Sequence, residues 1–183
     1  ADYSNFGSNL MCTVPSSPTA GSSIGILTTD RSGSLGYNGF PNQSYTHTFG
    51  GTSAAAPQVA GALGLAKQVR PNLNSRFAKH LLARTCRQVD ASDASTVGGW
   101  TTNAAGLKFN PNYGFGLLDA TALVNEAKVW GNISPATEYS GTGTVATAIP
   151  DGTSLLSRTF TVTTADAREK VEDVVITITA THG

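Results

Sequence analysis

Residues 50–61 constrain this chain more than any other stretch, and they read Gly-Gly-Thr-Ser-Ala-Ala-Ala-Pro-Gln-Val-Ala-Gly. Ser53 follows two glycines and a threonine and opens a run of small residues that predicts a tightly packed helix. At a helix N-terminus, a serine meets free backbone N–H groups and a positive dipole, which can hold a developing oxyanion. Gly50 and Gly51 allow a sharp approach and leave room beside the hydroxyl. Pro57 is expected near the first turn, where a missing N–H does least damage.

Two roles fit Ser53. A serine before an Ala-rich run also suits a simple N-cap on a buried helix. The full string favours a nucleophile, because it resembles the Gly-Thr-Ser motif of subtilisin-like serine proteases (subtilases), which small residues, Pro and an Ala-Gly helix follow. The resemblance implies that Ser53 is catalytic and that its N–H is one oxyanion donor. It also implies that Gly51 and Thr52 lie in the substrate and oxyanion environment.

The resemblance extends along most of the chain and narrows to the kexin-like proprotein convertases. Residues 1–7 resemble the segment before a substrate-facing loop, and residues 26–30 resemble the strand after it. Residues 71–85 are similar to the helix pair that follows the serine, and residues 110–120 resemble the closing helix. The end of the chain looks like the start of the β-sandwich, often called the P domain, that follows the catalytic domain.

This resemblance implies an α/β fold in two parts. Residues 1–134 would be the C-terminal part of a three-layer subtilisin-like peptidase domain. Residues 135–183 would be a linker and the first strands of a jelly-roll-like P domain, truncated. Residues 131–151 are indeed rich in Ser, Thr, Gly and Pro, and apolar residues then alternate with polar ones around residues 159–163 and 174–179, as in strands. Two strands cannot close a sandwich, so we expect a piece of a larger protein.

Local signals predict the other elements. Residues 1–50 indicate loops and short strands, for example at residues 24–27. The helix that opens at Ser53 should end near Arg70, before Pro71. A second helix should begin at a cap formed by Asn74 or Ser75, with an apolar stripe that includes Phe77, Leu81 and Leu82. Residues 91–111 indicate a loop anchored by Trp100, and Asp119 should cap a helix that ends near Trp130.

A serine protease also needs a general base, a carboxylate that orients it, and oxyanion donors. The subtilase triad runs in the order Asp, His, Ser, so the resemblance implies an Asp and a His before residue 1. The resemblance implies that the side-chain oxyanion Asn lies there too. None of Asn5, Asn9, Asn38 and Asn42 lies in the matching motif. His47, His80 and His182 are outside any base motif. Activity should therefore require the preceding part of the catalytic domain.

Composition limits partners and location. The chain of 183 residues has 12 basic and 12 acidic residues, which argues against nucleic acid or an anionic membrane as a partner. It has no apolar run of 18 residues, so no transmembrane segment is expected. Abundant Gly, Ser, Thr and Asn suit a protein of the secretory pathway, the cell surface or the extracellular space. Cys12 and Cys86 could pair with each other, stay buried as thiols, or pair outside the chain.

The resemblance thus predicts a serine endopeptidase that acts on polypeptide substrates through an acyl-enzyme on Ser53. The alternative is a non-catalytic binding or adhesion protein that keeps the subtilase scaffold. Subtilases often bind structural calcium, so the full-length protein could hold it. At the position of an acidic calcium ligand of the convertases this chain has Asn5, an amide, and we assign no metal site to its residues.

Overall fold

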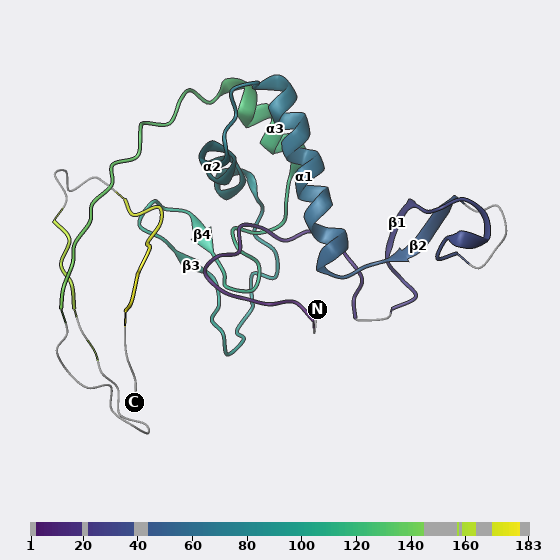
Figure 1. The fold of residues 1–183 in the computed structure, drawn as a ribbon, viewed down its shortest axis with the longest axis horizontal. Helices are drawn as coiled ribbons and strands as arrows, with labels where there is room; N and C mark the ends of the chain where they lie inside the picture. Colours follow the sequence, from purple (N-terminus) through teal and green to yellow (C-terminus); the bar gives the residue numbers. More distant parts are fainter. Residues whose placement is uncertain are drawn as a thin grey trace. The chain divides into compact units, whose positions relative to one another are not determined.

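The computed structural model describes residues 3–19, 22–38, 44–144, 157, 159–163 and 170–179. The chain divides into two compact units, Ala1–Asn132 and Ile133–Gly183. All helices and strands of the described residues lie in the first unit (Figure 1). Asn42 and His182, which the sequence analysis considered, lie outside the described residues.

The first helix, α1 (Thr52–Val69), confirms the helix expected after the glycine pair. The Arg70 N–H still donates to the Ala66 carbonyl, and Pro71 then prevents continuation. One detail differs from the expectation: because the helix begins at Thr52, Pro57 lies in the second turn and not near the first. Its ring leaves the Ser53 carbonyl without the N–H that residue i+4 normally donates. The Ser53 carbonyl therefore lacks the helical hydrogen bond that stabilises the backbone of the turns that follow.

Two further helices, α2 (Ser75–Thr85) and α3 (Ala120–Val129), confirm the expected caps. The Asn74 side chain, and not Ser75, accepts from the Phe77 N–H at 2.8 Å. The Asp119 carboxylate accepts from the Ala122 N–H at 2.9 Å. The expected closing helix over residues 110–120 was wrong in its start, since residues 110–119 form turns and bridges and the helix begins only at Ala120.

The core of this unit lies between the three helices, because α1 and α2 both pack against α3 (Figure 1). The buried apolar residues are Ala54, Ala62, Ala66, Leu73, Phe77, Leu81, Leu82, Leu123 and Ala127. Arg70 ties the ends of α1 and α3 together: its guanidinium lies 4.1 Å from the Phe77 ring centre and donates to the carbonyls of Trp130 and Gly131. The expected apolar stripe of α2 is thus confirmed as a core surface.

The strands β1 (Ile26–Thr29) and β2 (Tyr45–Phe49) form an antiparallel pair that leads directly into α1. Ile26 lies opposite Phe49 and Thr28 opposite Thr46, with an irregularity between them. The unit mixes helices and strands, as an α/β fold requires, but the described residues contain no parallel sheet. Its nearest equivalent there is the isolated parallel bridge between Thr13 and Leu117.

Residues 91–111 were expected to form a loop, but they contain a short hairpin of β3 (Thr101–Thr102) and β4 (Lys108–Phe109). Asn103 closes its turn, since its side chain accepts from the N–H groups of Ala105 and Leu107. An Asx side chain that bonds to nearby backbone is a turn signal that the loop prediction did not use. The anchoring role of Trp100 is confirmed: its ring stacks on Tyr113 at 6.2 Å, and its Nε1 donates to the Val89 carbonyl.

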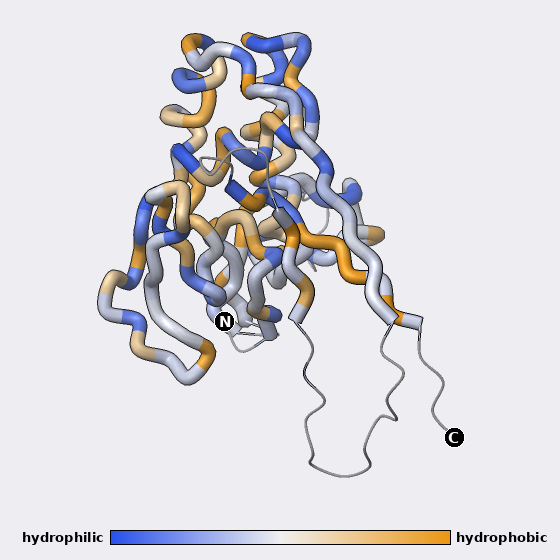
Figure 2. Tube along the Cα trace, turned by 90° about the vertical axis from the view of Figure 1, so that its left-hand side faces the viewer, coloured by the Kyte–Doolittle hydropathy of each residue, from blue (hydrophilic) through white to orange (hydrophobic). Residues whose placement is uncertain are grey.

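In the second unit, the described residues carry no β-strand. The strands expected around residues 159–163 and 174–179 are therefore absent from the described segments, although a hydrophobic stretch precedes the C-terminal end in Figure 2. Phe160 is 61% exposed and Ile176 76% exposed. A strand needs a neighbouring backbone to accept its hydrogen bonds and a surface to bury its apolar face. Alternation alone does not supply either.

Candidate active site

Ser53 is the second residue of α1, and it lines an open cavity of about 450 Å³. The cavity is lined by Tyr3, Ser17, Ser22, Thr48, Gly50, Gly51, Thr52 and Ser53. All three residues that the sequence placed in the nucleophile environment therefore lie on one cavity wall. Ser53 itself is exposed, and within the described part of the chain its hydroxyl has no hydrogen-bond partner.

The N-cap of α1 is Gly51, which has no side chain to cap the helix. Ser53 is therefore not the N-cap of α1, because it already lies inside the first turn. Its backbone N–H belongs to the first turn, where no intrahelical carbonyl is available to it. The first turn is further shaped by the Ala54 N–H, which donates to the Gly51 carbonyl at 3.1 Å.

Gly51 has φ of 73° and ψ of −176°, a conformation that residues with a Cβ rarely adopt. Two serines hold both sides of this residue. Ser17 Oγ accepts from the Gly51 N–H at 3.0 Å, and Ser16 Oγ donates to the Gly51 carbonyl at 2.7 Å. The preceding glycine allows this approach, since a Cβ on Gly50 would lie 2.3 Å from Ser17 Oγ. The glycine pair is therefore required by a close contact as well as by a turn.

The sequence analysis missed the contribution of residues 15–17 and Tyr3 to this site. The Tyr3 hydroxyl bonds to Ser17, and Gln58 Nε2 bridges the carbonyls of Pro15 and Ala54 at 2.8 Å each. The bonds from residues 15–17 to Gly51 and Gln58 join segments 34 or more residues apart in the sequence. Ser16 and Ser17 belong to no motif, so no local signal identifies them.

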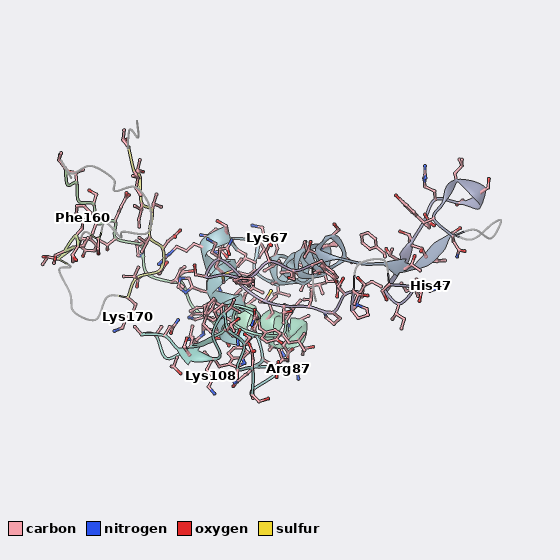
Figure 3. The ribbon with its side chains drawn as sticks, turned by 90° about the horizontal axis from the view of Figure 1, so that it is seen from below. His47, Lys67, Arg87, Lys108, Phe160 and Lys170 are labelled. Atoms are coloured by element: carbon pink, nitrogen blue, oxygen red, sulfur yellow. The ribbon has the colours of Figure 1, made fainter. Side chains whose placement is uncertain are left out.

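No histidine of the described residues lines the cavity. His47 lies on β2 (Figure 3), and its neighbour Thr48 lines the cavity. His47 itself is not among the residues that line the cavity. His80 instead packs edge-on against Trp130, with ring centres 6.1 Å apart.

The described asparagines Asn5, Asn9 and Asn38 are also absent from the cavity lining. Asn38 donates to the Tyr45 carbonyl from its side chain. The described segments bring no three His, Cys, Asp or Glu side chains together as metal ligands, and Asn5 supplies an amide in place of a carboxylate. No catalytic step is therefore assigned to a metal here.

Cys12 and Cys86 are free, half-buried thiols, and each shifts the pKa of the other. Their neighbours bring them together, because Thr13 and Arg87 both bond to the backbone of residues 116–118. A Cβ on Gly116 would lie 2.2 Å from the Arg87 carbonyl, so only glycine permits this approach. The hydrogen bond from Cys86 lowers the pKa of the Cys12 thiol. The same bond, together with burial and the charge of Asp119, raises the pKa of Cys86.

Comparison with known proteins decides the family. Residues 1–116 match the model of the Subtilase family. The chain belongs to the subtilase family. This subtilase chain also resembles the solved serine protease of Aeromonas sobria, with a TM-score of 0.55 and 30% identity over 61% of this chain and 24% of the other. No helix of the segments described here has the length and apolarity needed to cross a membrane.

The expected likeness to the kexin-like branch is confirmed by two curated relatives of this subtilase. Neuroendocrine convertase 2 of Drosophila melanogaster is 36% identical over 135 residues, which are 74% of this chain and 19% of the relative. Proprotein convertase subtilisin/kexin type 5 of Rattus norvegicus is 44% identical over 90 residues, which are 48% of this chain and 5% of the relative. The chain thus spans less than a fifth of the length of these relatives.

Proposed function

We propose that this chain carries the nucleophile of a kexin-like serine endopeptidase and that Ser53 is this nucleophile. The supporting observation is the position of Ser53 in the first turn of α1: Gly51 and not Ser53 is the N-cap, and among the described residues the Ser53 hydroxyl has no partner on the cavity wall. A nucleophile that must reach a peptide carbonyl needs this freedom. The Subtilase match over residues 1–116 includes this position.

The chemistry follows from this assignment. Ser53 Oγ attacks the scissile carbonyl carbon while its proton passes to a histidine base. The resulting oxyanion accepts from the Ser53 N–H and from a side-chain amide outside this chain. The intermediate then expels the amine, which takes the proton from the histidine, and leaves an acyl ester on Ser53. Water, activated by the same base, hydrolyses the ester and restores the serine.

We propose that the base, its orienting aspartate and the amide donor come from a preceding segment of the same protein. Two observations support this. No histidine among the described residues lines the Ser53 cavity. The outer face of α1 is also uncovered, since Leu65 is 54% exposed and a Cβ on Gly61 or Gly64 would meet no atom within 4 Å. A helix of small apolar residues normally packs against a neighbour.

We further propose that residues 1–134 are the end of the peptidase domain and that residues 135–183 begin a P domain, in a protein of the secretory pathway or the extracellular space. Polypeptides would be the substrates. The division of the chain near Asn132 and the names of the convertase relatives support this assignment.

The test is covalent labelling with a fluorophosphonate probe, which reacts with activated serines. The present chain and the full-length protein are compared, each beside Ser53→Ala, with the exposed loop variant Ser92→Ala as a matched serine control. We expect labelling of the full-length protein, its loss in Ser53→Ala, and its retention in Ser92→Ala. Full peptidase activity in Ser53→Ala would overturn the proposal. Absence of labelling and activity in the full-length protein would instead favour a non-catalytic binding scaffold.

A further inference from the structure

Ser17 occupies an unusual place beside the nucleophile loop. It is 7% exposed, although it is polar and lies in a segment without regular secondary structure. A buried hydroxyl is costly unless it is fully bonded, so its partners show what it does. They are the Gly51 N–H, at 3.0 Å, and the Tyr3 hydroxyl, at 3.2 Å.

The directions of these bonds follow from the available protons. Tyr3 has one hydroxyl proton, which it donates to the Ser17 carbonyl. The Ser17 hydroxyl then donates to Tyr3 Oη, and one of its two lone pairs accepts from the Gly51 N–H. The result is a directed chain from Tyr3 through Ser17 to Gly51, with every proton used.

We propose that Ser17, oriented by Tyr3, is a positioning residue for the Ser53 nucleophile. This inference rests on the proposed function of Ser53. Gly51 holds a backbone conformation with φ of 73° two residues before Ser53, and α1 offers no side-chain cap to fix it. Ser17 fixes the N–H of Gly51, while Ser16 fixes its carbonyl at 2.7 Å. Hydrogen bonds from Ser16 and Ser17 therefore hold the backbone of Gly51, two residues before Ser53, on both sides.

Kinetics can distinguish a positioning role of Ser17 from a direct contact between Ser17 and the substrate. Ser17 lines the cavity, so it could simply contact substrate. A contact of that kind would change KM, whereas misplacement of the nucleophile changes the rate of acylation. A displacement of about 1 Å can lower a rate on the order of 100-fold.

The experiment uses the full-length protein and a chromogenic peptide substrate. In Ser17→Ala we expect kcat to fall about 10- to 100-fold with KM changed less than about threefold. The second-order rate of fluorophosphonate labelling should fall by a similar factor, because the small probe needs Ser53 but little of the substrate site. The matched control is Thr85→Val, which removes a part-buried hydroxyl that donates to the Leu81 carbonyl within α2, outside the cavity lining. Its kcat should stay within about twofold of the parent.

A double-mutant cycle tests the chain of bonds. Tyr3→Phe alone should lower kcat by a smaller factor than Ser17→Ala, and it should have no further effect in the Ser17→Ala background, because both act through the same hydroxyl. Tyr3→Phe also keeps the proposal testable if Ser17→Ala does not fold.

Three results would overturn the inference: unchanged kcat in Ser17→Ala, a change confined to KM, or independent effects of Tyr3 and Ser17. Ser53→Ala separates this failure from that of the proposed function. If Ser53→Ala is inactive while Ser17→Ala has normal kcat, only the positioning role is wrong.

Discussion

At the scale of the residue, Asp93 is a hydrogen-bond acceptor for several groups in the segment between α2 and α3. Its carboxylate accepts from the side-chain amides of Asn110 and Asn112, at 2.9 and 3.0 Å, and from the Ser95 N–H. Asn110 is fully buried, so this bond satisfies a polar group inside the fold. The Asn110 bond first, and then those from Asn112 and Ser95, lower the pKa of Asp93 to about 2.

This pKa predicts a pH dependence of stability. Because the folded-state pKa lies below the ordinary value of 3.8, the carboxylate stabilises the fold above pH 3.8, and this contribution is lost as pH falls towards 2. Asp93→Asn should therefore lower the Tm near pH 7, and the difference from the parent should shrink between pH 4 and pH 2. Thermal unfolding followed by circular dichroism measures it. Asp173→Asn is the control, and a Tm difference independent of pH would contradict the prediction.

The thiol pair yields a second prediction at this scale. Cys12 should react with iodoacetamide faster than Cys86 near neutral pH. The Cys86 thiol stabilises the Cys12 thiolate by a hydrogen bond, whereas that bond, burial and the charges of Cys12 and Asp119 all raise the pKa of Cys86. Cys86→Ala removes the donor and should raise the pKa of Cys12, so alkylation of Cys12 slows. Mass spectrometry of the modified peptides across a pH series gives both rates. Equal alkylation rates for the two cysteines in the parent would contradict the assignment of Cys86 as the donor and Cys12 as the acceptor.

At the scale of the element, the helices begin where a side chain can accept a backbone N–H. Asn74 does this for α2 and Asp119 for α3, whereas α1 has a glycine at the same position. The start of α1 therefore depends on bonds from residues 16–17, and those of α2 and α3 do not. The residues that fix the backbone beside the candidate nucleophile therefore lie outside α1.

The cap of α2 can be tested directly. Asn74→Ala should lower the free energy of unfolding by about 1 kcal/mol, since it leaves the Phe77 N–H without its acceptor. Ser75→Ala, one residue later, should change it by less than about 0.5 kcal/mol, because Ser75 is not the cap. Urea unfolding of the two variants compares them. A larger loss in Ser75→Ala would mean that the cap had been assigned to the wrong residue.

At the scale of the whole molecule, α1 has one buried side and one open side. Its buried residues are Ala54, Ala62 and Ala66, while Leu65 and Val69 are exposed on the same helix. The open side carries Gly61 and Gly64, where an added Cβ would meet nothing within 4 Å. A helix with glycine at exposed interior positions loses stability without a gain in packing, unless another surface comes close.

Alanine at these glycines should therefore act in opposite ways. In the present chain, Gly61→Ala and Gly64→Ala should each raise the free energy of unfolding by up to about 1 kcal/mol, because alanine is the better helix former. In the full-length protein the same changes should lower activity, since the proposed preceding segment packs closely there. Urea unfolding of the chain and peptidase assays of the full-length protein measure the two effects. Full activity in both alanine variants would argue that no segment covers this side.

Much of the local structure was predictable from the sequence. The extent of α1 and the caps Asn74 and Asp119 depend on residues near one another in the chain. The Gly-Thr-Ser string also predicted the position of Ser53 at a helix start. Local preferences and short-range bonds are encoded in a window of a few residues, so such features can be read directly.

Other features were decided only by the tertiary structure. The clamp from Ser17 to Gly51 spans 34 residues, and the contact of Cys12 with Cys86 depends on both packing against residues 116–118. No short window contains either contact. Residues 174–179 show that a local pattern alone is not sufficient. They have the alternation of a strand, but the described backbone there forms no strand. Strand pairing and the clamp of a peptide both require groups distant in sequence to meet, and packing alone decides which of them do.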